Sequence, residues 1–179
     1  SEDSALTFGS APYPLASALE EQCPGIEQIV RLKTGIRENA RYENKLLPLG
    51  AVAADNSFFG VFDFRLAKGN PEATLEEPFS MVLTPASALS LFGDEEPLGK
   101  VIQYGDLGDY TVTGVLEDTS KLKSHIEIMP LISFSTLEAL VRQQKSDVSL
   151  DGWEYLNRCR IQGRPCPGGR SRCFRSQLS

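Results

Sequence analysis

The sequence predicts an α+β fold in which short helices alternate with a larger number of strands. Residues 26–33 alternate between apolar and polar side chains, as a half-buried strand does. A Thr-Pro pair precedes residues 86–92, and such a pair supplies both a cap and a first residue for a helix. Two apolar runs, 101–104 and 110–116, flank a loop rich in glycine and aspartate, which indicates a β-hairpin.

The first third of the chain is predicted to contain a helix and two strands. Residues 13–22 form a short helix that ends at a Pro-Gly pair. In the strand that follows, the two faces carry Ile26, Val30 and Leu32 on one side and Glu27, Arg31 and Lys33 on the other. Residues 34–39 are polar and predict a turn, and a second strand over 41–49 is interrupted by Pro48 and Gly50.

The densest aromatic cluster in the sequence follows Asp55, which stands where a helix N-cap belongs. The cluster consists of Phe58, Phe59, Phe62 and Phe64. Four rings can form a platform for a ligand, but buried aromatic side chains more often supply the packing energy of a core. We therefore predict that these rings lie in the core.

The run 91–100 predicts a corner between a helix and a strand. After a short apolar strand over 79–83, the helix over 86–92 should direct Leu89 and Phe92 inward. Gly93 should end this helix in a left-handed conformation. The acidic residues that follow then form a solvated turn.

A phosphate-binding loop is the alternative interpretation of Gly93 to Lys100. Such a loop has four residues between its glycines and a Ser or Thr after its lysine. Here five residues separate Gly93 from Gly99, and Val101 follows the lysine. Three acids, at 94–96, would also repel a phosphate, so the sequence excludes this site.

Few residues are candidates for metal binding or acid–base chemistry. Asp106 and Asp109 lie in the hairpin loop, but a calcium site needs about six to eight oxygen ligands, so a solvated turn is favoured. His125 is the only histidine, Glu127 is the only acid near it, and a loop histidine is favoured over a ligand or a general base. We therefore predict no catalytic, cofactor-binding or metal-ligating residue and no cofactor.

The last third of the chain predicts a strand, a helix and the beginning of another strand. The strand covers 131–134, and the sequence Ser-Thr-Leu-Glu at 135–138 is a capping box that should contribute about 1 kcal/mol to the helix. Leu137, Leu140 and Val141 form the apolar face of this helix. Residues 153–156 begin the final strand.

Composition indicates a water-soluble globular segment. The chain has 179 residues, of which 41% are hydrophobic and 23% are charged. No apolar run reaches the length of about 18 residues that a bilayer span requires, and no signal peptide is evident. The net charge of -6 conceals a basic C-terminal end, because 157–179 holds six of the 18 basic residues and no acid. The acidic remainder argues against nucleic acid as a partner.

Four motifs occur in a fixed order along the middle of the chain. They are ADNSFFGVFDF at 54–64, LT at 83–84, LFGDEEPLGK at 91–100 and TVTGVLED at 111–118. Their order and spacing resemble the extracytoplasmic domain of MacB/FtsX-type ABC transporter permeases, the MacB-like periplasmic core domain. Each motif is weak alone, and their shared order makes coincidence improbable.

The resemblance implies one periplasmic domain over 1–179 with two subdomains. A discontinuous, porter-like α/β subdomain would comprise 1–35 with 126–156, and a mixed, strand-rich subdomain would be inserted at 36–125. Residues 157–179 would be an atypical tail.

The resemblance also implies a function without catalysis. The domain would lie on the periplasmic side of the bacterial inner membrane and couple cytoplasmic ATP hydrolysis to export or extraction of a peptide, lipoprotein or drug-like substrate by mechanical transmission. Its partners would be an ABC ATPase subunit or domain, a second permease copy, and a periplasmic adaptor or substrate protein. Membrane helices would lie outside this segment.

Two other classes of protein remain as alternatives. A free-standing extracellular ligand-binding or adhesion module would lack flanking membrane helices in the full-length gene product. An enzyme such as a hydrolase would need acid–base groups, yet the sequence has no Gly-x-Ser-x-Gly motif and a single histidine.

The tail at 157–179 is predicted to be foreign to the fold, because no strand or helix periodicity continues into it. A shift of the coding frame near Asn157 or a disordered tail would produce such a sequence. The alternative is a metal site at Cys159, Cys166 and Cys173, whose spacing lacks the close pairs of structural zinc sites. We expect poor packing of the tail beyond its first few residues and an incomplete final strand pairing.

Overall fold

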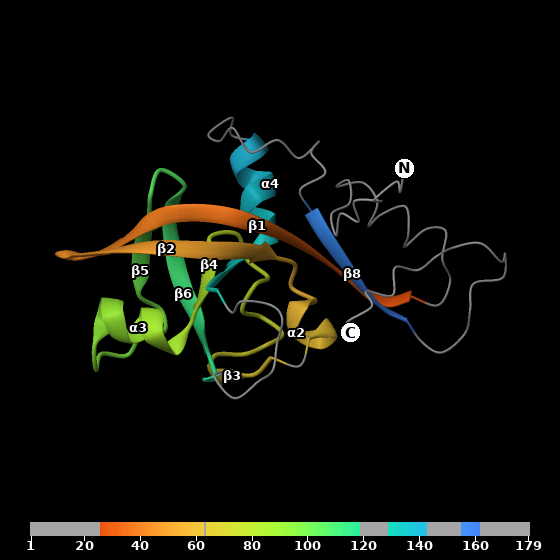
Figure 1. The fold of residues 1–179 in the computed structure, drawn as a ribbon, viewed down its shortest axis with the longest axis horizontal. Coiled ribbons are helices and arrows are strands. Elements are labelled where there is room, and N and C mark those ends of the chain that lie inside the picture. The colour runs from red at the N-terminus through yellow and green to blue at the C-terminus, as the bar shows by residue number, and fades with distance from the viewer. Residues whose placement is uncertain (1–25, 63, 119–128, 143–154, 162–179) are drawn as a thin grey trace, which may run out of the picture.

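The computed structural model describes residues 26–62, 64–118, 129–142 and 155–161, which form a mixed α/β fold with one strand-rich sheet and few helices (Figure 1). The strands are β1 (Ile26–Tyr42), β2 (Lys45–Ala54), β3 (Leu66–Lys68), β4 (Ser80–Leu83), β5 (Val101–Tyr104), β6 (Gly108–Leu116), β7 (Leu131–Ser133) and β8 (Tyr155–Ile161). The helices are α2 (Phe58–Val61), α3 (Pro85–Phe92) and α4 (Phe134–Arg142).

The sheet closes on itself. Its strands are ordered β2-β7-β4-β6-β5-β1-β8, and β1 also pairs with β2, so six of the described strands form a ring. Most pairs are antiparallel, whereas β2 with β7 and β4 with β6 are parallel. We call this ring the closed sheet.

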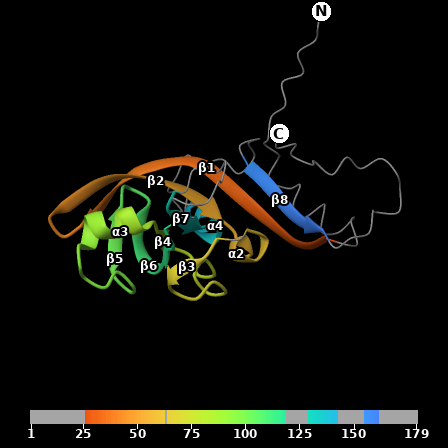
Figure 2. The ribbon, with the colours of Figure 1, turned by 60° about the horizontal axis from the view of Figure 1, so that its bottom comes forward.

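Strand β1 is longer than the ring requires. Its second half pairs with β2 as far as Leu32, which lies opposite Ala54. Its first half pairs with β8, from Ile26 opposite Ile161 to Lys33 opposite Tyr155. Figures 1 and 2 show this two-stranded ribbon extending away from the closed sheet. We call it the β1–β8 ribbon.

The predicted turn at 34–39 and the predicted interruption at Pro48 are both wrong. Strand β1 continues through this region with a bulge between Lys33 and Ile36, and the chain reverses at Glu43 instead. Pro48 lies opposite Asn39 within β2. On its other side β2 pairs with β7 only over 52–54, so Pro48 occupies an edge position, where proline is tolerated.

Two hydrophobic clusters form the core. One lies inside the closed sheet and includes Met81, Leu91, Phe92, Ile102, Tyr104, Tyr110 and Ile132. The other lies against the beginning of β1 and includes Val30, Leu32, Phe58, Phe62, Leu75 and Leu131. Phe58 contacts the rings of Phe59, Phe62 and Phe64, which confirms the prediction that the aromatic cluster packs in the core.

Helix α3 forms as its sequence predicts, with one side chain facing the wrong way. Thr84 Oγ1 accepts a hydrogen bond from the Ser87 N–H at 3.2 Å, and Gly93 follows the helix with a positive φ of 63°. Phe92 is 3% exposed, but Leu89 is 63% exposed, so the prediction that Leu89 points inward is wrong. Ala88, Leu91 and Phe92 form the buried face, and at 100° per residue Leu89 falls outside it.

Helix α4 begins at Phe134, one residue before the predicted capping box. Ser135 Oγ therefore does not cap; it lies 2.6 Å from Ser133 Oγ. Glu138, the other half of the predicted box, bonds to Arg31. Leu137 and Leu140 are buried as predicted, and Val141 is partly buried.

The final strand, β8, continues into the tail that is predicted to be foreign to the fold. Residues 157–161 pair with β1, so these first five residues of the tail belong to the sheet. The predictions for 162–179, for the helix at 13–22 and for His125 lie outside the described residues. Strand β7 and helix α4, assigned to the first subdomain, share a sheet and a core with the inserted one, and the subdomain boundaries stay a proposal.

No helix in the described parts of the chain combines the length and the apolar character that crossing a membrane requires.

Candidate functional site

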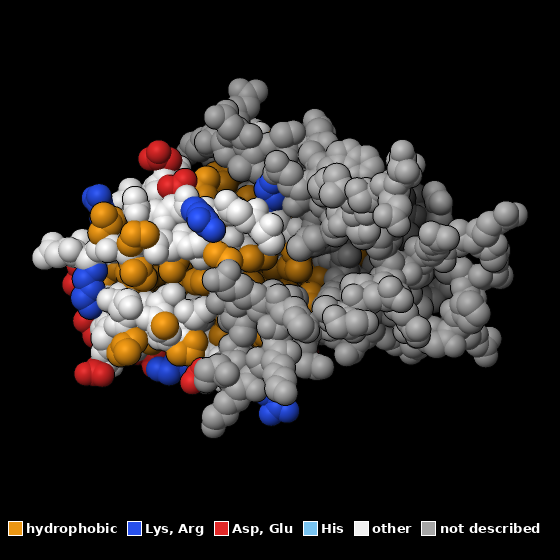
Figure 3. All heavy atoms as spheres, viewed as in Figure 1, with side chains coloured by type: hydrophobic (Ala, Val, Ile, Leu, Met, Phe, Trp, Pro, Cys, Tyr) orange, Lys and Arg blue, Asp and Glu red, His pale blue; other side chains and the backbone are white. Residues whose placement is uncertain are grey.

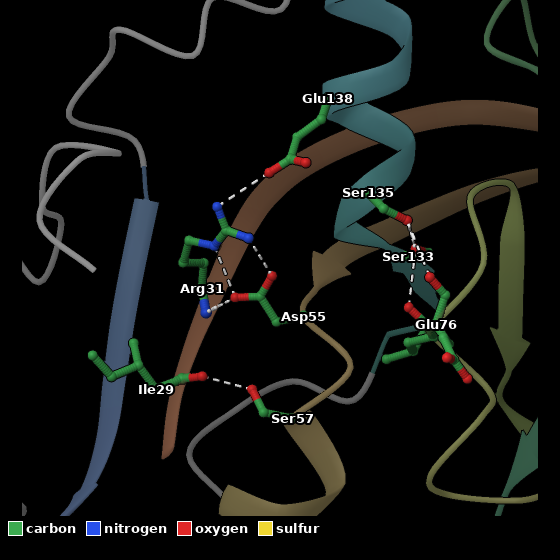
Figure 4. A network of polar contacts seen from close by, with 9 residues as sticks. Ile29, Arg31, Asp55, Ser57, Glu76, Ser133, Ser135 and Glu138 are labelled. Atoms are coloured by element: carbon green, nitrogen blue, oxygen red, sulfur yellow. Dashed lines mark hydrogen bonds and ion pairs between the residues drawn. The ribbon is translucent and has the colours of Figure 1, made fainter. Parts of the chain in front are cut away.

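Arg31 and Asp55 form a polar cluster where β1 leaves the closed sheet (Figure 4). The guanidinium donates two hydrogen bonds to the carboxylate, from Nε to Oδ2 at 2.9 Å and from Nη2 to Oδ1 at 2.7 Å. The backbone N–H of Arg31 also donates to Oδ2 at 2.8 Å, and the backbone N–H of Asp55 donates to the Arg31 carbonyl at 3.2 Å. The predicted N-cap role of Asp55 is therefore wrong, because its carboxylate is committed to Arg31.

The same guanidinium reaches helix α4. Its Nη1 donates to Glu138 Oε1 at 3.2 Å, and its carbon lies 4.3 Å from the centre of the Phe134 ring. A planar guanidinium can bond two carboxylates at its edge while an aromatic ring covers its face. We call Arg31, Asp55, Glu138 and Phe134 the Arg31 cluster.

Helix α2 is fastened to the same part of β1. Ser57, which precedes α2, donates its hydroxyl to the Ile29 carbonyl at 2.6 Å and so makes no side-chain cap. A Cβ at residue 60 would lie 2.5 Å from Oε1 of Gln28, the end of a flexible side chain that can move aside, so the contact between α2 and β1 does not depend on this glycine. This segment of the first motif thus connects the turn after β2 to the β1–β8 ribbon.

Lys33 lies two residues beyond Arg31 and is also removed from solvent. It is 8% exposed, and burial lowers the pKa of its amine. The sequence predicts a strand buried on one face only, and the burial of Lys33 shows that the opposite face is also covered at this position. Arg31 on the same face contacts Glu138 and Phe134 of α4, a contact that the local alternation of β1 could not reveal.

The run 91–100 forms the corner between α3 and β5. Lys100 Nζ donates to Tyr42 Oη and to Glu95 Oε2, each at 2.9 Å, and Lys68 Nζ donates to Glu96 Oε2 at 2.7 Å. Hydrogen bonds to Tyr42 and Glu95 raise the pKa of Lys100, and the hydrogen bond from Lys100 lowers the pKa of Glu95. These ion pairs are exposed, so each contributes little to stability.

Apolar side chains are also exposed around this corner. The larger ones are Leu89, Leu98 and Val101, and Leu46 is exposed at the start of β2. Figure 3 shows apolar side chains on this face of the molecule, with charged groups at its edge. Within the described ranges no three His, Cys, Asp or Glu side chains are grouped closely enough to hold a metal ion.

Comparison with known proteins gives the family. The sequence matches the family described as MacB-like periplasmic core domain over residues 3–155. The chain belongs to this family. No curated protein matches the chain.

Solved structures show the same MacB-like fold. A domain of a protein titled a permease from Porphyromonas gingivalis has a TM-score of 0.70 at 23% identity, over 90% of this chain and 67% of the other. The extracellular domain of the noncanonic ABC-type transporter YknZ from Gram-positive bacteria gives 0.62 at 17%, over 88% and 76%. The periplasmic region of MacB from Actinobacillus actinomycetemcomitans gives 0.53 at 17%, over 85% and 80%.

The four motifs lie within the range that matches the family, whereas the Arg31 cluster is evident only in the structure. The matched range ends at Tyr155, close to the point where the sequence loses its periodicity. Arg31 and Glu138 are 107 positions apart, and nothing local marks either as a bonding partner. No pattern in the sequence marks the cluster. The covering of the Arg31 face becomes visible only when α4 is placed against it.

Proposed function

We propose that this MacB-like domain is the extracytoplasmic part of an ABC transporter permease and that it acts by mechanical transmission, without catalysis. It would lie on the periplasmic side of the inner membrane and relay movement driven by ATP hydrolysis to a peptide, lipoprotein or drug-like substrate. Family membership supports the general kind of protein. The mode of action is our inference from the geometry.

The observation that carries this proposal is the β1–β8 ribbon. Ile26 and Ile161 are paired with each other, so the connection that precedes β1 and the connection that follows β8 begin at the same end of the ribbon. A displacement applied to both connections moves a single antiparallel ribbon. Such a ribbon resists separation through its interstrand hydrogen bonds, which suits it to carrying a displacement into the closed sheet.

The partners follow from this proposal. A cytoplasmic ATPase subunit or domain would supply the movement through membrane helices outside this segment, and a second permease copy would complete the transporter. A periplasmic adaptor or the substrate itself would contact the outer surface. We propose two subdomains, 1–35 with 126–156 and 36–125, and because β7 and α4 of the first pack with the second, we propose that movement occurs between the β1–β8 ribbon and the closed sheet.

Replacing the domain tests the proposal in the full-length permease. With the permease and its ATPase in lipid vesicles, residues 26–161 would be exchanged for a Gly/Ser linker. We expect ATP hydrolysis to continue and ATP-dependent substrate release to stop. Unimpaired release from the linker variant would contradict the proposal.

The absence of catalysis has its own test. Calorimetric titration of the purified domain with ATP and magnesium should give no saturable binding, because the only sequence resembling a phosphate loop carries three acids. Binding tighter than about 100 μM, equivalent to about 5.5 kcal/mol, would contradict it.

A further inference from the structure

Arg31 lies at the junction between the β1–β8 ribbon and the closed sheet. Leu32 is the first residue of β1 that pairs with β2, whereas Arg31 and the residues before it pair with β8 alone. Along the backbone of β1, a displacement of the ribbon therefore passes this point before it reaches the closed sheet. The Arg31 side chain strengthens the backbone contact with Asp55 and adds a bond to a second segment, α4, through Glu138.

These two segments belong to different parts of the fold. Asp55 directly follows β2, and Glu138 lies on α4, which follows β7. The side chains of Arg31, Asp55 and Glu138 are 22%, 19% and 26% exposed, whereas those of the ion pairs at the 91–100 corner are 36% to 59% exposed. Bonds of a partly buried, bidentate guanidinium are stronger and less screened than those of exposed pairs.

We infer that Arg31 is the coupling residue of the domain. Its guanidinium ties the ribbon to the end of β2 and to α4 together, so a displacement of the ribbon reaches both segments at once. The inference rests on the proposed mechanical function for its biological meaning. The coupling itself can be measured in the isolated chain.

Hydrogen exchange on the full 179-residue chain tests the coupling. In Arg31→Gln, amide exchange should rise at least about fivefold in two separate segments, 52–61 and 134–142, because both lose a bond to the same group. In Glu138→Gln the rise should be confined to 134–142. Arg41→Gln is the matched control, since Arg41 is an exposed arginine on the same strand, and it should change neither segment.

The conservative variant separates coupling from general stability. Arg31→Lys keeps the charge but cannot bond two carboxylates with a planar fork, so both segments should again exchange faster. If Arg31→Gln fails to fold, Arg31→Lys carries the test. A uniform rise across the whole sheet, or a rise in only one of the two segments, would overturn the inference.

A second measurement separates this inference from the proposed function. In the assembled permease, addition of ATP should alter exchange in 134–142, and Arg31→Lys should abolish that change while ATP hydrolysis continues. Retention of the change in Arg31→Lys would overturn the role of Arg31. If ATP does not change exchange in 134–142 of the wild-type permease, the proposed mechanical function is contradicted. The coupling through Arg31 is then judged from the isolated chain alone.

Discussion

Two tyrosines inside the closed sheet differ in one hydrogen bond. Tyr104 and Tyr110 pack edge to face with ring centres 5.6 Å apart, and neither is exposed. Tyr104 Oη donates to the Leu49 carbonyl at 2.8 Å, whereas Tyr110 Oη is buried without a partner among the described residues. A buried hydroxyl without a hydrogen bond lowers stability, because it has lost its contacts with water.

We therefore predict opposite effects of removing the two hydroxyls. Tyr104→Phe should lower the free energy of unfolding by about 1 kcal/mol, the value of a typical hydrogen bond. Tyr110→Phe should leave it unchanged or raise it. Urea denaturation of the two variants beside the wild type measures both, and an equal loss in both would show that Tyr110 Oη has a partner.

The same burial predicts a loss of stability at alkaline pH. Burial raises the pKa of Tyr104 from its ordinary value of 10.0 to about 12, and burial also raises the pKa of Tyr110. The folded state thus keeps a proton that the unfolded state loses, so this contribution is complete below pH 10 and disappears as the pH rises towards 12. Tyr104→Phe should reduce the loss of unfolding free energy between pH 8 and pH 11 by about 1 kcal/mol. If Tyr104→Phe leaves the dependence of unfolding free energy on pH unchanged, the raised pKa of Tyr104 is not a cause of the alkaline loss of stability.

The sequence does not reveal several residues that hold the fold together. Phe79 has a φ of 58°, a conformation that favours glycine, and its N–H donates to Thr136 Oγ1 at 2.6 Å. Asp55 and Glu138 both have a strong local interpretation as helix caps, and both bond to Arg31 instead. Local patterns indicate only the hydrogen bonds that a side chain can make within a few residues. A charge-assisted bond to Arg31, which the fold brings close, is stronger than a helix cap at both positions.

At the scale of single elements, helix α3 offers a direct test of the core. Phe92→Ala should lower the free energy of unfolding by roughly 3 to 5 kcal/mol, because Phe92 is buried and packs against the Tyr42 ring at 4.5 Å. Leu89→Ala on the same helix should change it by no more than about 0.5 kcal/mol, since Leu89 is exposed. Denaturant unfolding of the two variants measures both free energies. A large loss of stability in Leu89→Ala would mean that this surface is covered.

Elements with local start and stop signals were predicted well, and elements defined by distant pairing were not. Helix α3 has a threonine cap, a proline and a final glycine, and the β5–β6 hairpin has a glycine-rich loop, so both were confirmed. The β1–β2 hairpin was missed because it turns at Glu43, which adopts a φ of 50° without any glycine. Its 17-residue first strand exists because β8 and β2 pair with different halves of it.

For the whole molecule, the end of the chain provides a test of which residues belong to the fold. Deleting 163–179 should leave the melting temperature unchanged, because the described sheet ends at Ile161. Deleting 155–179 should lower it by about 5 °C or more, since the first half of β1 then loses the partner strand β8. Thermal melts of the two truncated chains make the comparison. A loss of stability on the shorter deletion would show the tail to be part of the fold.

The closure of the sheet was beyond prediction from local patterns. The family resemblance gave the kind of domain, and the alternation of residues gave several of its strands. Closure depends on β7 inserting between β2 and β4, strands that are distant from it in sequence. The Arg31 cluster has the same origin, because it forms only when α4 follows β7 into place.

We propose that ATP hydrolysis in a partner ATPase moves this domain mechanically. Hydrogen exchange of the domain within the assembled permease and ATPase, compared with and without ATP, measures that movement. We expect altered exchange in the β1–β8 ribbon and in α4, with no nucleotide bound to the domain itself. Unaltered exchange throughout residues 26–161 during steady ATP turnover would contradict it.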